Sequence, residues 1–174
     1  LGAEVGLVGV GLPGGKVRTL GLAVDGDVAA PMEYAAAGTP CGDVMSGSTV
    51  CICRDVIDRF PDDEPLRALR AVAYCGVPIV DAEERVIGHI AVVARSEIRM
   101  PDLYCDVLQL FAMRVGAELE RARSEARFAG VFEHSPDAVL IVDDDGRIVQ
   151  ASRVAVTTFG YSERELLALS VDDL

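Results

Sequence analysis

Five cysteines are the residues of this 174-residue chain with the most varied possible chemistry. They are Cys41, Cys51, Cys53, Cys75 and Cys105. Their number is odd, and no two of them have the Cys-x-x-Cys spacing of redox motifs or zinc ribbons. The set therefore argues against a disulfide framework and favours a reducing compartment. We accordingly expect a cytoplasmic protein.

Cys41 follows Thr39-Pro40, a pair that predicts the start of a short helix ending near Gly47. Threonine caps helix N-termini, and proline at the first helical position loses no needed hydrogen bond. A thiol in that first turn would be favoured as thiolate by the helix dipole, which would suit redox sensing. The alternative is a small buried residue that packs the helix onto a sheet.

Cys51 and Cys53 alternate on a strand expected at 49–53, so their side chains should face the same way. Their spacing does not suit a mutual disulfide in an extended strand. They could line a pocket or pack in the core.

Two histidines, His89 and His134, are too few for a multi-ligand zinc site, so we expect no metal centre. His89 lies in an apolar strand, where an imidazole could serve as an axial haem ligand. A lone strand histidine is more often hydrogen-bonded or exposed to solvent. The cofactor, if there is one, stays open.

Two further patterns have simpler explanations than the sites they suggest. Gly9, Gly11 and Gly14 match Gly-x-Gly-x-x-Gly, but a dinucleotide site needs a helix next, and the segment 16–20 has the pattern of a strand. The acidic run 143–146 lacks the alternate acids of an EF-hand loop and indicates a turn. No Ser-His-Asp set, Walker loop or kinase motif is present, so we expect no catalysis by these residues.

The composition limits the kinds of partner that this chain could bind. The chain is 51% hydrophobic, enough for a sizeable core, and its formal net charge is -12. A surface this acidic repels phosphate backbones and anionic lipid, so nucleic acid and membrane contacts are not expected. No apolar run is long enough to span a bilayer. The chain begins at Leu1 without methionine, and we expect it to be a piece of a longer protein.

Hydrophobic patterning predicts two hairpins, 3–12 with 16–24 and 72–80 with 86–94. A short strand and short helices at 40–47, 55–60 and 66–70 lie between them. Antiparallel strands with segregated helices predict an α+β fold.

A long helix should follow from Pro101 to about Glu133, with apolar residues every three or four positions. Such a helix is longer than a small sheet can cover, which favours a parallel homodimer. The residues expected at that dimer contact are Leu108, Phe111, Val115, Leu119 and Ala122.

Several separate motifs resemble those of GAF domains over residues 3–127. They are Gly38-Thr39-Pro40-Cys41, Phe60-Pro61-Asp62-Asp63, Ala73-Tyr74-Cys75-Gly76-Val77-Pro78-Ile79 and Ile87-Gly88-His89-Ile90-Ala91-Val92. The resemblance implies an antiparallel sheet with a ligand cleft, here without the usual first helix. Bilin-binding members usually follow their cysteine with histidine, and Gly42 stands in that place.

The tail resembles the start of a PAS domain. Its motifs are Phe132-Glu133-His134-Ser135-Pro136-Asp137-Ala138, Val142-Asp143, Gly146-Arg147-Ile148 and Phe159-Gly160-Tyr161-Ser162. Ser152 stands where these domains commonly have asparagine, and serine also caps a helix. We expect a GAF-like domain at 1–101, a signalling helix at 102–131 and a partial PAS-like α/β domain at 132–174.

The resemblance implies a non-catalytic sensory segment, as in bacterial sensor histidine kinases or diguanylate cyclases, that senses a small molecule or dimerises and relays the signal through the helix. The residues expected around the cleft are Tyr34, Cys41, Val44, Cys51, Tyr74 and His89. The alternatives are a redox-responsive module, a purely structural dimerisation module, and a methionine-sulfoxide reductase acting through Cys51, Cys53 or Cys75.

Overall fold

A computed structural model describes residues 2–174, so the predicted start of the first domain, Leu1, lies outside the described residues. The chain divides into two compact units, one ending at Glu120 and one running from Arg121 to Leu174. Each unit is described by itself.

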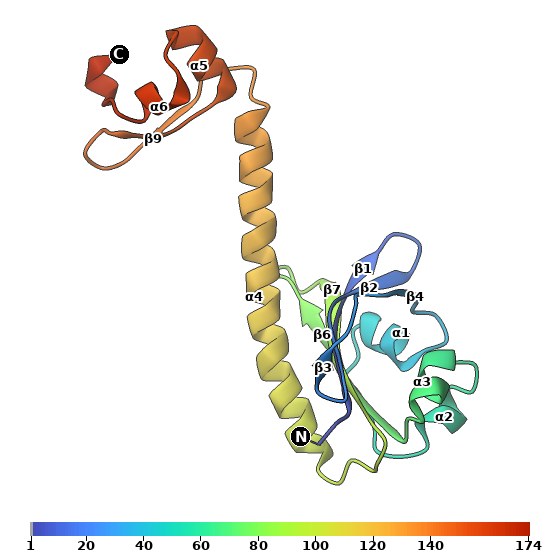
Figure 1. Cartoon of the computed structure of the whole chain (residues 1–174). Coiled ribbons are helices and arrows are strands. Elements are labelled where there is room, and N and C mark those ends of the chain that lie inside the picture. Colours follow the sequence, from blue (N-terminus) through green and yellow to red (C-terminus); the bar gives the residue numbers. More distant parts are fainter. Residues whose placement is uncertain (1) are drawn as a thin grey trace. The chain divides into compact units, whose positions relative to one another are not determined.

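The first unit is built on one antiparallel sheet (Figure 1). Its strands are β1 (Val5–Leu12), β2 (Lys16–Val24), β3 (Asp27–Val28), β4 (Glu33–Ala35), β5 (Val50–Ile52), β6 (Ala73–Val80) and β7 (Val86–Ala94). They lie in the order β3-β2-β1-β7-β6-β5, and β4 pairs with β2. The predicted α+β fold is confirmed. The sequence predicted about five strands here and missed β3 and β4, which are two and three residues long.

The glycines near the N-terminus serve the β1–β2 hairpin and its packing. Gly14 and Gly15 have φ of 79° and 73°, a conformation that suits glycine in a tight turn. A Cβ on Gly9 would lie 2.7 Å from the His89 ring, so this glycine makes room for a buried imidazole. The Gly-x-Gly-x-x-Gly pattern therefore belongs to a hairpin, as predicted.

Three short helices cover one face of the sheet: α1 (Pro40–Met45), α2 (Val56–Arg59) and α3 (Glu64–Leu69) (Figure 1). Thr39 caps α1 as predicted, because its Oγ1 accepts a hydrogen bond from the Gly42 amide at 3.2 Å. Asp63 caps α3 in the same way, accepting from the Leu66 amide at 3.0 Å.

The long helix α4 (Pro101–Glu133) is confirmed, and its first half packs on the opposite face of the sheet. Tyr104, Leu108 and Ala112 are buried there, at the spacing of one helix face. Gly116 permits a close approach, because a Cβ would lie 2.8 Å from the Val80 carbonyl oxygen. The sheet therefore separates two apolar layers.

The second unit contains a two-stranded sheet, two short helices and a 3-10 turn. These are β8 (Leu140–Val142), β9 (Ile148–Ala151), α5 (Arg153–Phe159), α6 (Glu163–Leu166) and η1 (Val171–Asp173). Ser152 caps α5, and Ser162 with Glu165 forms a capping box at the start of α6. α6 ends at Leu166, and beyond it the Leu169 carbonyl accepts a hydrogen bond from the Ile148 amide.

No helix within residues 2–174 combines the length and apolar character needed to cross a membrane.

Candidate functional site

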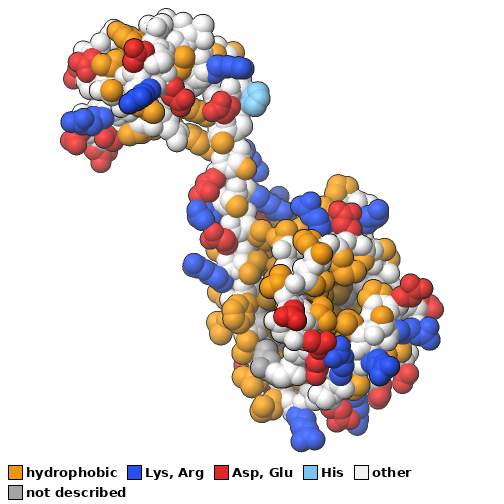
Figure 2. Space-filling view, viewed as in Figure 1, with side chains coloured by type: hydrophobic (Ala, Val, Ile, Leu, Met, Phe, Trp, Pro, Cys, Tyr) orange, Lys and Arg blue, Asp and Glu red, His pale blue; other side chains and the backbone are white. Residues whose placement is uncertain are grey.

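The main candidate site is a cavity of about 860 Å³ between the sheet and the short helices α1 and α3. Ligand pockets for small molecules have volumes of this order. Hydrophobic side chains gather on the exposed face of this domain (Figure 2). The walls come from β1, β2, β4, β6, β7, the start of α1 and the segment 59–69. Their apolar residues include Val5, Leu7, Leu22, Val24, Phe60, Leu66, Leu69 and Val93.

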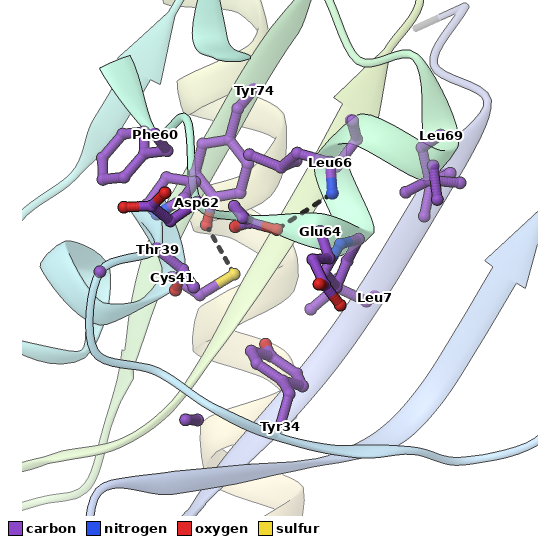
Figure 3. A pocket seen from close by; sticks show the side chains of 18 of the residues that line it. Leu7, Tyr34, Thr39, Cys41, Phe60, Asp62, Glu64, Leu66, Leu69 and Tyr74 are labelled. Atoms are coloured by element: carbon purple, nitrogen blue, oxygen red, sulfur yellow. Dashed lines mark hydrogen bonds between the residues drawn. The ribbon is translucent and has the colours of Figure 1, made fainter. Parts of the chain in front are cut away.

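Tyr74 brings a hydroxyl into this apolar space (Figure 3). Its ring folds along β6 over Gly76, where a Cβ would collide with the Tyr74 hydroxyl oxygen. The hydroxyl donates to the Cys41 sulfur at 3.4 Å. The Gly76 position is therefore what allows Tyr74 to reach Cys41.

Cys41 lies buried in the first turn of α1. Burial raises the pKa of the Cys41 thiol, although hydrogen bonding by Tyr34 and Tyr74 partly lowers it. Of the two alternatives that the sequence left open, this burial favours a small residue that packs α1 onto the sheet over a thiolate at the helix start. The cost of removing a charge from water outweighs the dipole of a helix of six residues.

Tyr34 joins the cavity to a buried histidine. Its hydroxyl oxygen and His89 Nε2 lie 3.1 Å apart and share a hydrogen bond. Burial lowers the pKa of His89 to about 4, so its imidazole is neutral at pH 7. His89 Nδ1 has no hydrogen-bond partner among the described residues. Tyr34 thus lies between the cavity and a polar group that the fold leaves partly unsatisfied.

Asp63 is the buried acid of the cavity wall. Burial raises the pKa of its carboxyl group, and the hydrogen bond from Leu66 partly lowers it. Its side chain already accepts that bond to cap α3, and a carboxylate can accept several more. Asp63 therefore offers an acceptor to a molecule in the cavity. Asp62 and Glu64, both exposed, and Arg59 lie at the same wall.

Of the six residues predicted around the cleft, Tyr34, Cys41 and Tyr74 line the cavity. Val44 is fully buried in the adjoining core, and His89 lies behind Tyr34. An axial haem role for His89 would need an open approach, but its ring packs against Gly9 and its Nε2 is bonded to Tyr34.

The prediction that Cys51 lines the cleft is wrong, because its side chain lies on the opposite face of the sheet. It pairs with Cys75 across β5 and β6, and both pack in the layer against α4. The strand ends at Ile52, so Cys53 lies beyond it. Cys51 therefore does not line the cavity.

Phe60, Asp63 and Leu66 also line the cavity and were not predicted as site residues. Asp63 belongs to the motif Phe60-Pro61-Asp62-Asp63, and its spacing to Leu66 is that of a helix cap. That signal could have identified a buried carboxylate at a helix start.

The residues predicted for a dimer contact divide between two environments. Leu108 is buried against its own sheet, with Val115 and Leu119 packed partly against the same layer. Phe111 and Ala122 are exposed. Leu108 is therefore part of the domain core, which corrects its placement at a dimer contact.

Comparisons with known proteins give the family. Residues 2–119 match the GAF domain family and residues 126–174 match the PAS domain family. The chain belongs to the GAF domain family, and its GAF domain is followed by a PAS domain segment. Such domains are sensory modules of bacterial signalling proteins.

Solved structures support the fold. The nlh2 GAF domain of A. Aeolicus in an inactive state has a TM-score of 0.55 at 14% identity, covering 70% of this chain and 76% of that chain. A domain of a putative two-component sensor histidine kinase from Sinorhizobium meliloti 1021 gives 0.51 at 12% identity, covering 74% and 87%. Residues 122 to 287 of a methyl-accepting chemotaxis protein give 0.52 at 21% identity, covering 69% and 78%.

Among curated proteins, sporulation kinase E of Bacillus subtilis (strain 168) is 33% identical over 70 residues, which is 40% of this chain. The chain spans only 10% of the length of that relative.

Proposed function

We propose that this chain is a non-catalytic sensory segment of a bacterial signalling protein, and that its GAF domain binds a small molecule in the cavity. The cavity itself, with its apolar walls and few polar groups, is the observation that supports this proposal. The five free cysteines favour a reducing, cytoplasmic setting.

The ligand is a compact, mainly apolar molecule that carries a hydrogen-bond donor such as an amine. Its apolar part would contact Leu7, Phe60 and Leu69. Its donor would meet the Asp63 carboxylate, which lies in a wall where burial already disfavours an uncompensated charge. The hydroxyls of Tyr34 and Tyr74 supply further polar contacts.

Occupancy would reach the signalling helix through the sheet. Tyr74 faces the cavity, and its neighbour Cys75 faces the layer that packs on α4. A ligand that favours one arrangement of this strand would shift the population of α4 arrangements by its difference in affinity for the two.

A cavity-blocking substitution tests the binding proposal. Val24 lines the cavity, so Val24→Phe should fill part of it. Val28→Phe is the matched control, because Val28 is 91% exposed and outside the cavity wall. Native mass spectrometry of the purified chain would detect a co-purified ligand. Thermal shift with a panel of small amines and their neutral analogues would detect added ones.

The expected result is a ligand or a stabilising amine with the parent chain and with Val28→Phe, and neither with Val24→Phe. Equal stabilisation of all three proteins would place binding elsewhere. If the parent chain holds no co-purified ligand and binds none of the added amines, the alternative of a purely structural module would be favoured.

We also propose that α4 carries a homodimer contact, through apolar residues that the domain leaves exposed or partly exposed. Leu103, Leu110 and Phe111 are 44%, 69% and 57% exposed, and with Val107 they recur at helical spacing. Sedimentation of the chain should give a dimer that Leu110→Asp dissociates. Gln109→Asp, at an exposed position outside this stripe, should leave the dimer intact. A parent chain that sediments as a monomer at micromolar concentration would refute this contact.

A further inference from the structure

Three cysteines meet on the face of the sheet opposite the cavity. The sulfur atoms of Cys51, Cys75 and Cys105 all lie within 4.8 Å of one another. Those of Cys75 and Cys105 are 3.6 Å apart. Cys51 and Cys75 are directly paired across β5 and β6, and Cys105 lies in the second turn of α4. The fold thus brings together thiols from three separate elements.

The sulfur triangle has the dimensions of a three-coordinate thiolate site. With metal–sulfur bonds of about 2.3 Å, three sulfurs around one ion lie ~4 Å apart or less. The observed separations bracket this distance, so closure needs side-chain movements below about 1 Å. Cys75 is fully buried, while Cys51 and Cys105 are partly exposed, which leaves the cluster open to solvent from two sides.

The surroundings favour neutral thiols. Cys75 is fully buried, and Cys51 is partly buried in the same layer between the sheet and α4. The adjacent layer is apolar, with Ala73, Val77 and Tyr104 among its residues.

The apolar layer determines which charge a bound ion should have. Three thiolates around a monovalent ion leave a net charge of -2, and around a divalent ion -1, in a layer where buried charge is costly. Around a trivalent centre the charges cancel. Structural zinc also prefers four protein ligands, and the sulfurs of Cys41 and Cys53 lie outside this group.

We infer that Cys51, Cys75 and Cys105 form a binding site for a trivalent thiophilic metalloid such as arsenite. Neutral arsenous acid, As(OH)3, would react with three thiols to give one As(S-Cys)3 centre and three water molecules. Three As–O bonds break and three As–S bonds form, and each thiol proton leaves on a hydroxyl as water. Arsenic stays trivalent, so the step needs no oxidant or reductant.

Binding there would tie α4 to the sheet. Two ligands lie on the adjacent strands β5 and β6 and the third on the helix, so one metalloid centre would crosslink all three elements. The first half of the signalling helix would then be held against β6 (Figure 1). This site lies on the other face of the sheet from the cavity and does not depend on a ligand there.

The test uses the full chain, reduced and then freed of reductant under anaerobic conditions. Arsenite is titrated in, and native mass spectrometry counts arsenic atoms and lost hydrogens. Thiol titration counts the cysteines that arsenite protects. The expected result is one arsenic per chain with three hydrogens lost and three thiols protected. Far-UV circular dichroism should show an unchanged fold.

The matched variants remove one thiol at a time. Cys51→Ser and Cys105→Ser, at the partly exposed positions, should weaken arsenite binding by roughly tenfold or more, since each loses one of three bonds. Cys53→Ser, at a partly exposed thiol outside this group, should bind as the parent does. Because Cys75 is fully buried, the two partly exposed positions carry the test even where Cys75→Ser fails to fold.

Three results would overturn the inference. The first is unchanged affinity in both Cys51→Ser and Cys105→Ser. The second is tighter binding of cadmium or copper(I) than of arsenite by the same thiols. The third is a reduced chain that takes up no arsenite but loses two hydrogens in air, which would identify a Cys75–Cys105 disulfide instead.

Discussion

Leu108 and Leu110 of α4 provide a direct test of which face of the helix belongs to the domain core. Leu108 is 3% exposed in the layer between the sheet and α4, whereas Leu110 is 69% exposed. Replacing each by alanine makes the same chemical change in opposite environments. The two effects on the free energy of unfolding should therefore differ widely.

Leu108→Ala removes a buried side chain and leaves a cavity, which costs about 3 kcal/mol in a packed core. With a urea dependence of about 2 kcal/mol/M, the unfolding midpoint should fall by roughly 1.5 M. Leu110→Ala should change the free energy of unfolding by no more than about 0.5 kcal/mol. Urea denaturation followed by circular dichroism, at a concentration where the chain is monomeric, measures both.

Equal destabilisation by the two substitutions would refute the assignment of Leu108 to the core. So would a Leu108→Ala variant with parent-like unfolding but a weakened dimer, because that pattern would return Leu108 to the intermolecular contact expected from sequence.

Three further predictions concern the cavity wall, the buried histidine and the helix contact. Asp63→Asn should abolish binding of a cationic ligand and keep the hydrogen bond that caps α3 at Leu66. Asp63→Ala should abolish binding as well and cost about 1 kcal/mol of stability through loss of the cap. Calorimetric titration measures the binding, and thermal unfolding measures the stability. His89, with a pKa of about 4 in the fold against 6.5 ordinarily, binds fewer protons folded than unfolded, so stability should fall as pH drops from about 6.5 to 4. This loss of stability, up to about 3 kcal/mol, should be absent in His89→Gln, because glutamine does not titrate. Parallel plots of stability against pH for the two proteins would contradict this prediction. Gly116→Val should cost about 1–3 kcal/mol because its side chain meets the Val80 carbonyl, and an unchanged melting temperature would show that α4 does not pack so closely.

The elements with local signals were predictable from sequence. Thr39 and Ser162 start helices because their side chains bond to nearby amides, which depends on neighbours three residues away. The first hairpin follows from two β-rich runs around Gly14-Gly15, and the second from two apolar runs around the acidic turn 81–85. The length of α4 follows from an uninterrupted helical pattern.

The faces were not predictable in the same way. Alternation places Ile52 opposite Cys51, but the side of the sheet that each one meets depends on distant elements. In α4, apolar residues such as Leu108 and Leu110 occupy two faces, and only the sheet decides which face is buried. Seven of the 24 residues that line the cavity come from the segment 59–65, which has no hydrophobic periodicity to reveal it.

Adjacent residues of β6 serve opposite sides of the sheet: Tyr74 reaches the cavity and Cys75 the thiol cluster. One peptide group is the shortest possible connection between two sites. If a ligand in the cavity changes the affinity of the thiol cluster by some factor, occupation of the cluster changes the affinity of the cavity by the same factor. A domain built in this way would integrate two chemically unrelated stimuli through the single strand β6.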